Sequence, residues 1–300
     1  MNPKIKIFLV FTLLWFVFIG IAYGIVYALL LSGTITGGSF YIYTLMIMVP
    51  ILLLFNIVTY FFSDRMVLAA YNAKIVDEQS APRLAKVVRR VVERFNLPMP
   101  RLAIVPSETP NAFATGRDPE HAVVAVTEGN MGILTDDELE GVIGHEMAHV
   151  KDRDILLMSV VATAAAIISI AARLVFYQML FGRRDTRVNP LVLVAAAITA
   201  PIAAMLVQLA ISRNREYKAD MVGARTIMKP LALARALSKL ESYNVRSPMQ
   251  MERSNPAHAS LFIVNPFRGS GFASIFSTHP PIKERIRRLQ AMASREGYLQ

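Results

Sequence analysis

Two long apolar segments without a charged residue constrain this sequence more than any other feature. They cover residues 7–31 and 41–62, with a Gly-rich polar stretch between them. More than 20 uncharged apolar residues are enough to span a bilayer as a helix. A cleaved signal peptide would have a shorter apolar core followed by a cleavage site. We therefore predict that residues 1–63 form a transmembrane helical hairpin.

Two further apolar segments, 155–181 and 188–211, are rich in alanine and less hydrophobic. Arg173 interrupts the first of them. Three arrangements fit the pair: two spans, a re-entrant dip, or a hairpin buried in protein. Of these, spanning is favoured. For the chain as a whole, a mean hydropathy of +0.42 with only 18% charged residues suggests a membrane protein with a soluble part.

The remaining sequence forms two soluble pieces, 64–154 and 212–300, which we expect to build one discontinuous domain. The second piece carries 15 Lys and Arg against 6 Asp and Glu. It has no basic patch interleaved with aromatic residues, so an anionic lipid surface fits this charge better than nucleic acid. Lys and Arg beside the segments place both pieces on the cytoplasmic side. The loop 182–190, with three arginines, disagrees with that orientation.

The soluble pieces contain local signals for helices and strands. Apolar residues at helical spacing predict a helix over 82–95 that opens with a proline. Residues 102–105 and 121–129 are predicted to be strands. Thr135 and Glu138 match a capping box, so a helix is expected to start after Thr135.

The helix that starts there carries the sequence His145-Glu146-Met147-Ala148-His149. Residues four apart share one face of a helix, so both imidazoles can reach one metal ion. Glu146 then lies beside the ion, where it can hold and deprotonate a water. The chain has no cysteine, so a metal must be held by histidines and carboxylates. Asp152 and Asp154 follow and indicate a hydrated site.

A catalytic zinc site needs a third protein ligand and an open position. Glu216 is the candidate, and Asp220, one helical turn later, can accept a hydrogen bond from the outer N–H of a ligand histidine. The alternative is that Glu216 is a solvated charge among neighbouring basic residues.

Several ordered motifs resemble one family of membrane-associated zinc peptidases. They are the HExxH sequence, the downstream ExxxD, NAFATG at 111–116 and THPPIKERI at 278–286. The four-segment layout is similar to the HtpX branch of that family, the heat-shock membrane proteases of bacteria. The similarity covers nearly the whole chain.

The resemblance implies an integral-membrane peptidase of the gluzincin type, mainly α-helical with a small β-sheet. It implies one Zn²⁺ per subunit, bound by His145, His149 and Glu216, with Glu146 as the catalytic base. It also implies a multi-pass protein of the bacterial inner membrane with its active site facing the cytoplasm. Its substrates are then misfolded or damaged membrane proteins, in quality control and stress response.

Two further functional assignments follow from the family motifs. His279 is a candidate oxyanion donor, although the two prolines after it also fit a plain helix-entry turn. Asn111, Ala112 and Phe113 are candidates for binding an extended substrate by strand addition, and an ordinary strand end fits them equally well.

Two other functions remain to be weighed against a membrane-bound zinc endopeptidase. An intramembrane protease would carry its HExxH inside an apolar span, whereas acidic residues surround it here. A non-enzymatic membrane scaffold or holdase would use zinc structurally, with four protein ligands.

Overall fold

The computed structural model describes residues 60–156, 213–246 and 280–298, together with positions 12, 50, 54, 57, 58 and 158. Within these residues the fold is mainly helical with one small mixed sheet, which confirms the expected class. The four apolar segments lie almost entirely outside the described residues. No helix within the described ranges is both long enough and apolar enough to cross a bilayer. The division into a hairpin at 1–63, an apolar pair at 155–211 and a discontinuous domain stays a prediction.

The sheet has four strands in the order β1-β2-β4-β3. They are β1 (Lys74–Val76), β2 (Arg101–Val105), β3 (Ala112–Thr115) and β4 (Val123–Thr127). The central pair β2 and β4 runs parallel, and the two outer strands run antiparallel to their neighbours. The sheet therefore ends at β3, which is an edge strand among the strands described.

The strand predicted over 121–129 is shorter than expected. A 3₁₀ turn (Pro119–His121) precedes β4, and helix α4 (Glu128–Ile133) begins directly after it. The side chain of Thr127 accepts a hydrogen bond from the N–H of Asn130, so the last residue of β4 caps α4. The strand ends because this cap offers its backbone a helical continuation.

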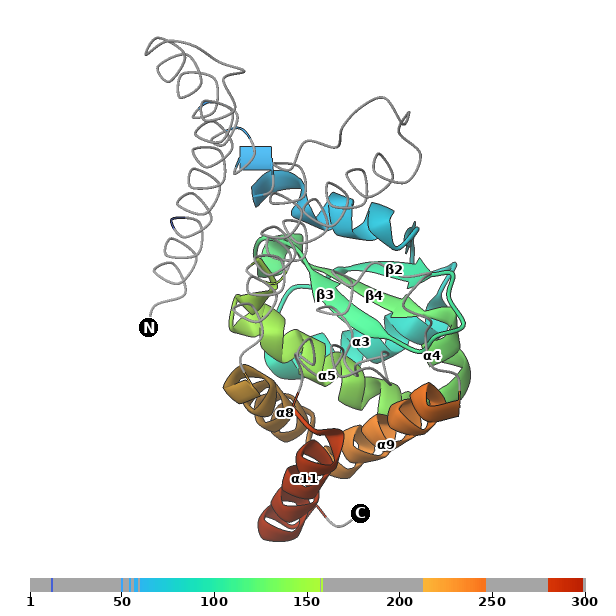
Figure 1. Ribbon diagram of the computed structural model, residues 1–300, viewed down its shortest axis with the longest axis vertical. Helices are drawn as coiled ribbons and strands as arrows, with labels where there is room; N and C mark the ends of the chain where they lie inside the picture. The colour runs from blue at the N-terminus through green and yellow to red at the C-terminus, as the bar shows by residue number, and fades with distance from the viewer. Residues whose placement is uncertain are drawn as a thin grey trace, which may run out of the picture.

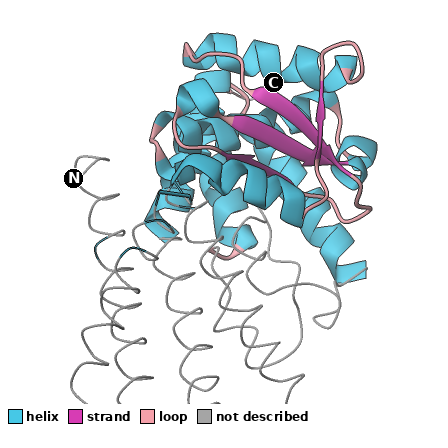
Figure 2. Cartoon of the chain, turned by 90° about the horizontal axis from the view of Figure 1, so that it is seen from above, coloured by secondary structure: helices cyan, strands magenta, loops and turns pink. Residues whose placement is uncertain are grey.

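Helices cover both faces of the sheet (Figures 1 and 2). Side chains of β4 alternate: Val124 and Val126 face the larger core, and Val123 and Ala125 face a smaller one. This is the period of two expected of a strand that is buried on both faces. The helical residues 60–70 pack against the smaller core.

Five helices contribute buried side chains to the larger core. They are α3 (Pro82–Phe95), α5 (Asp136–Lys151), α8 (Arg213–Ile227), α9 (Pro230–Arg246) and α11 (Ile282–Glu296). Helix α3 has the predicted bounds and buries its predicted apolar stripe. It ends where Asn96 adopts a left-handed conformation with φ 53°, which directs the chain away from the helix.

Helix α5 is the centre of this arrangement and packs against α3, α8, α9 and β3. It begins after Thr135 with both hydrogen bonds of the predicted capping box. Two buried carboxylates in its first half hold it to its neighbours. Glu138 pairs with Lys239 at 2.7 Å, and Glu140 pairs with Lys229 at 2.5 Å and with Arg90. These pairs fix α5 on the helices around it.

Candidate metal centre

The second half of α5 presents the two histidines on one face. Both imidazoles are buried, and their ring centroids lie 4.9 Å apart with the planes at 87°. The capping box sets where the helix starts, and the spacing of four residues then places one ring above the other. The sequence prediction that both rings share a face is confirmed.

Helix α8 approaches this face closely because two glycines meet at the crossing. A Cβ atom on Gly223 would lie 2.8 Å from the carbonyl carbon and oxygen of Gly144. Any larger residue at 223 would push the two helices apart. The close approach brings the Glu216 carboxylate, two turns earlier on α8, to the histidines.

Glu216 completes a group of three donors that could hold a metal ion. Its carboxylate oxygens lie 3.6 Å from Nε2 of His145 and 3.5 Å from Nε2 of His149. One donor atom from each residue lies within 4.8 Å of the others, and all three side chains are buried. An ion bound tetrahedrally at about 2.0–2.1 Å holds its ligand atoms roughly 3.4 Å apart. The spacing and the two-nitrogen, one-oxygen donor set therefore fit a zinc-type ion, and Glu216 is not a solvated charge.

A carboxylate lies behind each imidazole. Nδ1 of His145 is 2.9 Å from Oδ1 of Asp220, the partner that the sequence predicted. Nδ1 of His149 is 3.9 Å from Oδ2 of Asp154. Such partners orient the rings so that the opposite nitrogen faces the ion.

The expectation that Asp154 lies in a hydrated environment is wrong. Asp154 was expected, with Asp152, to mark a hydrated site, but its residue is only 5% exposed. The chain leaves α5 through Arg153, which has a left-handed φ of 56°, and residues 154–156 are helical again. This turn brings Asp154 back toward His149 instead of toward solvent. Asp152 lies at the surface and pairs with Lys218.

Arg285 of α11 reaches the metal centre through Asp220, a contact that the sequence did not predict. Its side chain is fully buried, and two of its nitrogens donate to the two oxygens of Asp220, each at 2.7 Å. Arg285 lies within the quoted THPPIKERI motif, but nothing local shows that it reaches a helix 65 residues away.

The electrostatics of the centre favour positive charge. Burial acts to lower the pKa of His149, but hydrogen bonding to Asp154 and Glu216 outweighs burial and raises that pKa to about 10. Burial is likewise outweighed at His145, where Asp220 and Glu216 raise the pKa. Burial opposes ionisation of Asp220, yet Arg285 and His145 lower its pKa to about 2. These carboxylates attract protons or a cation to the same place.

Glu146 lies next to the two histidines and is 7% exposed. One of its oxygens accepts a hydrogen bond of 3.0 Å from the backbone N–H of Ala114 in β3. Burial and the nearby Glu216 raise its pKa, while the two histidines and Ala114 oppose that effect. The structure thus ties this carboxylate to the edge strand.

The residues predicted to bind substrate lie at or beside this strand. Asn111 bonds to Thr127 of β4 through its N–H and C=O. Ala112 and Phe113 belong to β3, and the Phe113 ring packs on Tyr71 at 4.9 Å in the smaller core, away from the metal centre. The Phe113 side chain therefore does not face the metal centre, and its backbone groups, like those of Asn111, are directed toward β4. His279 lies outside the described residues.

Comparisons with known proteins show the family to which the chain belongs. The model of peptidase family M48 matches residues 78–293. A "Protease HtpX homolog" of Thermococcus kodakarensis is 54% identical over 247 residues, 81% of this chain and 84% of that protein. Another, of Syntrophobacter fumaroxidans, is 50% identical over 266 residues, 87% of this chain and 93% of that protein. A crystal structure of S. mikatae Ste24p matches with a TM-score of 0.47 and 17% identity, over 96% of this chain and 66% of that one.

Proposed function

Because the chain belongs to peptidase family M48, we propose that it is a membrane-bound zinc endopeptidase. The observation that carries the proposal is the convergence of His145, His149 and Glu216 around one point, with Glu146 beside them. Three protein ligands is the number that catalytic zinc sites use, whereas structural sites use four. The alternative is a non-enzymatic scaffold or holdase, which would need a fourth protein ligand.

In the proposed reaction, Glu146 acts as the general base. When bound, zinc supplies a Lewis acid that polarises the scissile carbonyl and lowers the pKa of a water molecule. Glu146 takes a proton from the attacking water and returns it to the leaving amine. The hydrogen bond from Ala114 holds its carboxylate in place for both transfers. His279 is the proposed donor to the tetrahedral oxyanion.

We propose that an extended substrate pairs with β3. The Ala114 N–H points away from β4 and toward Glu146. Backbone groups alternate in direction along an antiparallel strand, so the N–H and C=O of Ala112 face the same edge. A substrate strand on this edge lies next to the catalytic carboxylate. Such pairing contacts the backbone of the substrate more than its side chains. It therefore suits unfolded or damaged segments of membrane proteins, which differ in sequence.

The membrane part of the proposal rests on the sequence. The uncharged segments 7–31 and 41–62, with 155–181 and 188–211, support a multi-pass protein of the bacterial inner membrane. The flanking Lys and Arg support an active site on the cytoplasmic face, where quality control of membrane proteins and stress response are the proposed roles.

The first test compares wild type with Glu146→Gln. Both are purified in detergent with a chelator, zinc is added, and cleavage of casein is followed on a gel. We expect the variant to lose about 10²–10⁴-fold in rate, the usual contribution of a general base, while it still binds zinc. The control Glu140→Gln removes a buried carboxylate from the other half of α5 and should still cleave.

Two results would contradict the proposal. Equal cleavage by wild type and Glu146→Gln would exclude this residue as the base. Failure of wild type to cleave any unfolded protein while zinc is bound would favour the scaffold instead.

A further inference from the structure

Helix α11 contributes a charge to the interior of the protein. Arg285 has no exposed surface, and its neighbour in the chain, Glu284, pairs with surface arginines instead. A buried guanidinium is unfavourable unless its hydrogen bonds are satisfied. Asp220 meets this need with two parallel hydrogen bonds of 2.7 Å. Helices α8 and α11 are therefore joined by a paired charge in the core.

This pair continues directly into the metal centre. Oδ1 of Asp220 lies 2.7 Å from Arg285 and 2.9 Å from Nδ1 of His145. The planar guanidinium of Arg285 binds both carboxylate oxygens and so fixes the plane of the carboxylate. A lysine ammonium, which is a single point charge, cannot do this. The orientation of the carboxylate then sets the direction in which the His145 ring faces Glu216.

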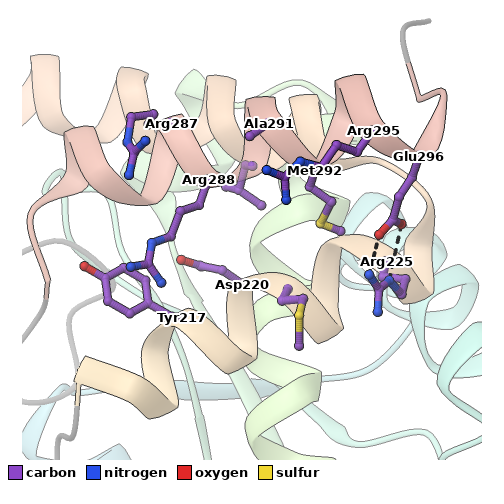
Figure 3. A pocket seen from close by; sticks show the side chains of 11 residues that line it. Tyr217, Asp220, Arg225, Arg287, Arg288, Ala291, Met292, Arg295 and Glu296 are labelled. Atoms are coloured by element: carbon purple, nitrogen blue, oxygen red, sulfur yellow. Dashed lines mark hydrogen bonds and ion pairs between the residues drawn. The ribbon is translucent and has the colours of Figure 1, made fainter.

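The rest of the α8–α11 junction is open, as Figure 3 shows. A cavity of about 370 Å³ separates the helices, with Met221, Leu289 and Met292 in its lining. Arg288 covers the Tyr217 ring at 3.7 Å, and Arg225 pairs with Glu296 at the far end. Both of these contacts are at the surface, so they cannot fix the metal centre as the buried pair does.

We propose that Arg285 is a positioning residue of the metal centre. Its guanidinium fixes the Asp220 carboxylate, and Asp220 fixes the His145 imidazole with Nε2 toward Glu216. Helix α11 is thereby part of the metal centre although it supplies none of the three donors. The proposal rests on the proposed function and assigns a further residue to the same site.

The test compares Arg285→Lys with Arg288→Lys in the full chain in detergent. Both variants keep a positive charge on α11 and lose only the planar guanidinium group. Zinc affinity is measured by competition with a chelator of known affinity. Loss of an outer partner of a metal ligand typically costs 10–100-fold in affinity. We expect a loss of about 10-fold for Arg285→Lys and less than about 2-fold for Arg288→Lys.

Cobalt(II) substitution supplies a second readout, because its visible spectrum depends on ligand geometry. The spectrum should shift in Arg285→Lys and not in Arg288→Lys, while the metal-free unfolding temperatures stay close. A folded Arg285→Lys with wild-type zinc affinity and an unchanged cobalt spectrum would overturn the proposal.

A double variant tests the route through Asp220 and replaces the first test if Arg285→Lys does not fold. Asp220→Asn/Arg285→Met removes both charges from the interior. If Arg285 acts through Asp220, this variant binds zinc no more weakly than Asp220→Asn alone. A further 10-fold loss would show that Arg285 acts by another route. A wild type that binds no zinc at all would instead contradict the proposed function.

Discussion

The two halves of helix α5 both contain buried titratable side chains but differ in how their charges are balanced. In the first half, Glu138 and Glu140 are each 3% exposed, and each has lysine or arginine partners from other elements. In the second half, His145, Glu146 and His149 face the carboxylate of Glu216. No ammonium or guanidinium within the described ranges is paired with Glu146.

This difference separates the part of the helix that supports the fold from the part that binds. Buried acids with cationic partners hold elements together without any ligand. Around the two imidazoles, Asp220 pairs with Arg285 and Asp154 pairs with Arg215, and the further negative charge of Glu146 and Glu216 favours protons or a cation. A metal ion should therefore stabilise the second half and leave the first half unaffected.

The largest expected effect is the loss of metal binding in Glu216→Gln. Glutamine keeps the shape of the side chain but removes the negative charge. Zinc affinity should therefore fall by more than about 100-fold, which is more than the loss of a residue that only bonds to a metal ligand would cause. Zinc at 100 times its Kd stabilises a protein by about 2.7 kcal/mol. Thermal unfolding with and without zinc should show this stabilisation in wild type and not in the variant. A variant that zinc still stabilises would remove Glu216 from the ligand set.

Gly223→Ala should affect binding and stability together. The added Cβ would meet the backbone of Gly144 at 2.8 Å, so α8 must move away from α5 and carry Glu216 with it. Overpacking of this kind costs about 1–3 kcal/mol. Zinc affinity and the unfolding midpoint should both fall. Gly132→Ala is the control, because nothing lies within 4 Å of its Cβ position in α4. Unchanged zinc affinity in folded Gly223→Ala would show that the crossing does not set the donor spacing.

Glu140→Gln should lower stability without changing zinc affinity. Breaking a buried ion pair costs about 3–5 kcal/mol, and we expect about 2 kcal/mol here because the partner side chains Arg90 and Lys229 are 37% and 30% exposed. Denaturant unfolding of the metal-free protein measures this loss. Glu78→Gln, which breaks a surface pair with Arg89, should cost less than about 1 kcal/mol. A tenfold loss of zinc affinity in Glu140→Gln would mean that the two halves of α5 are not independent.

The sequence was sufficient where the determining interactions are local. The capping box at Thr135 and the proline at position 82 give the starts of α5 and α3, because each acts within one helical turn. The four-residue spacing of the histidines likewise places both rings on one face. Strand β4 was predicted too long because the cap made by Thr127 competes with strand extension over the same residues.

The contacts missed from the sequence all depend on packing. Arg285 reaches Asp220 from another helix, and no periodicity or spacing indicates which of the many arginines would be buried. Asp154 follows two polar residues and resembles a surface aspartate until the left-handed Arg153 redirects the chain. The close crossing at Gly144 and Gly223 depends on the relative placement of two helices, which neither sequence segment specifies alone.

The metal centre is drawn from segments that are far apart in the chain, and this separation has a consequence for biosynthesis. A ribosome adding about 5–20 residues per second needs several seconds to pass from the histidines to Glu216, about 70 residues later, and several more to reach Arg285. During that interval the nascent chain carries two metal-binding imidazoles without their carboxylate partner. The emerging polypeptide therefore cannot be cut by its own centre until α8 has been made and has packed against α5.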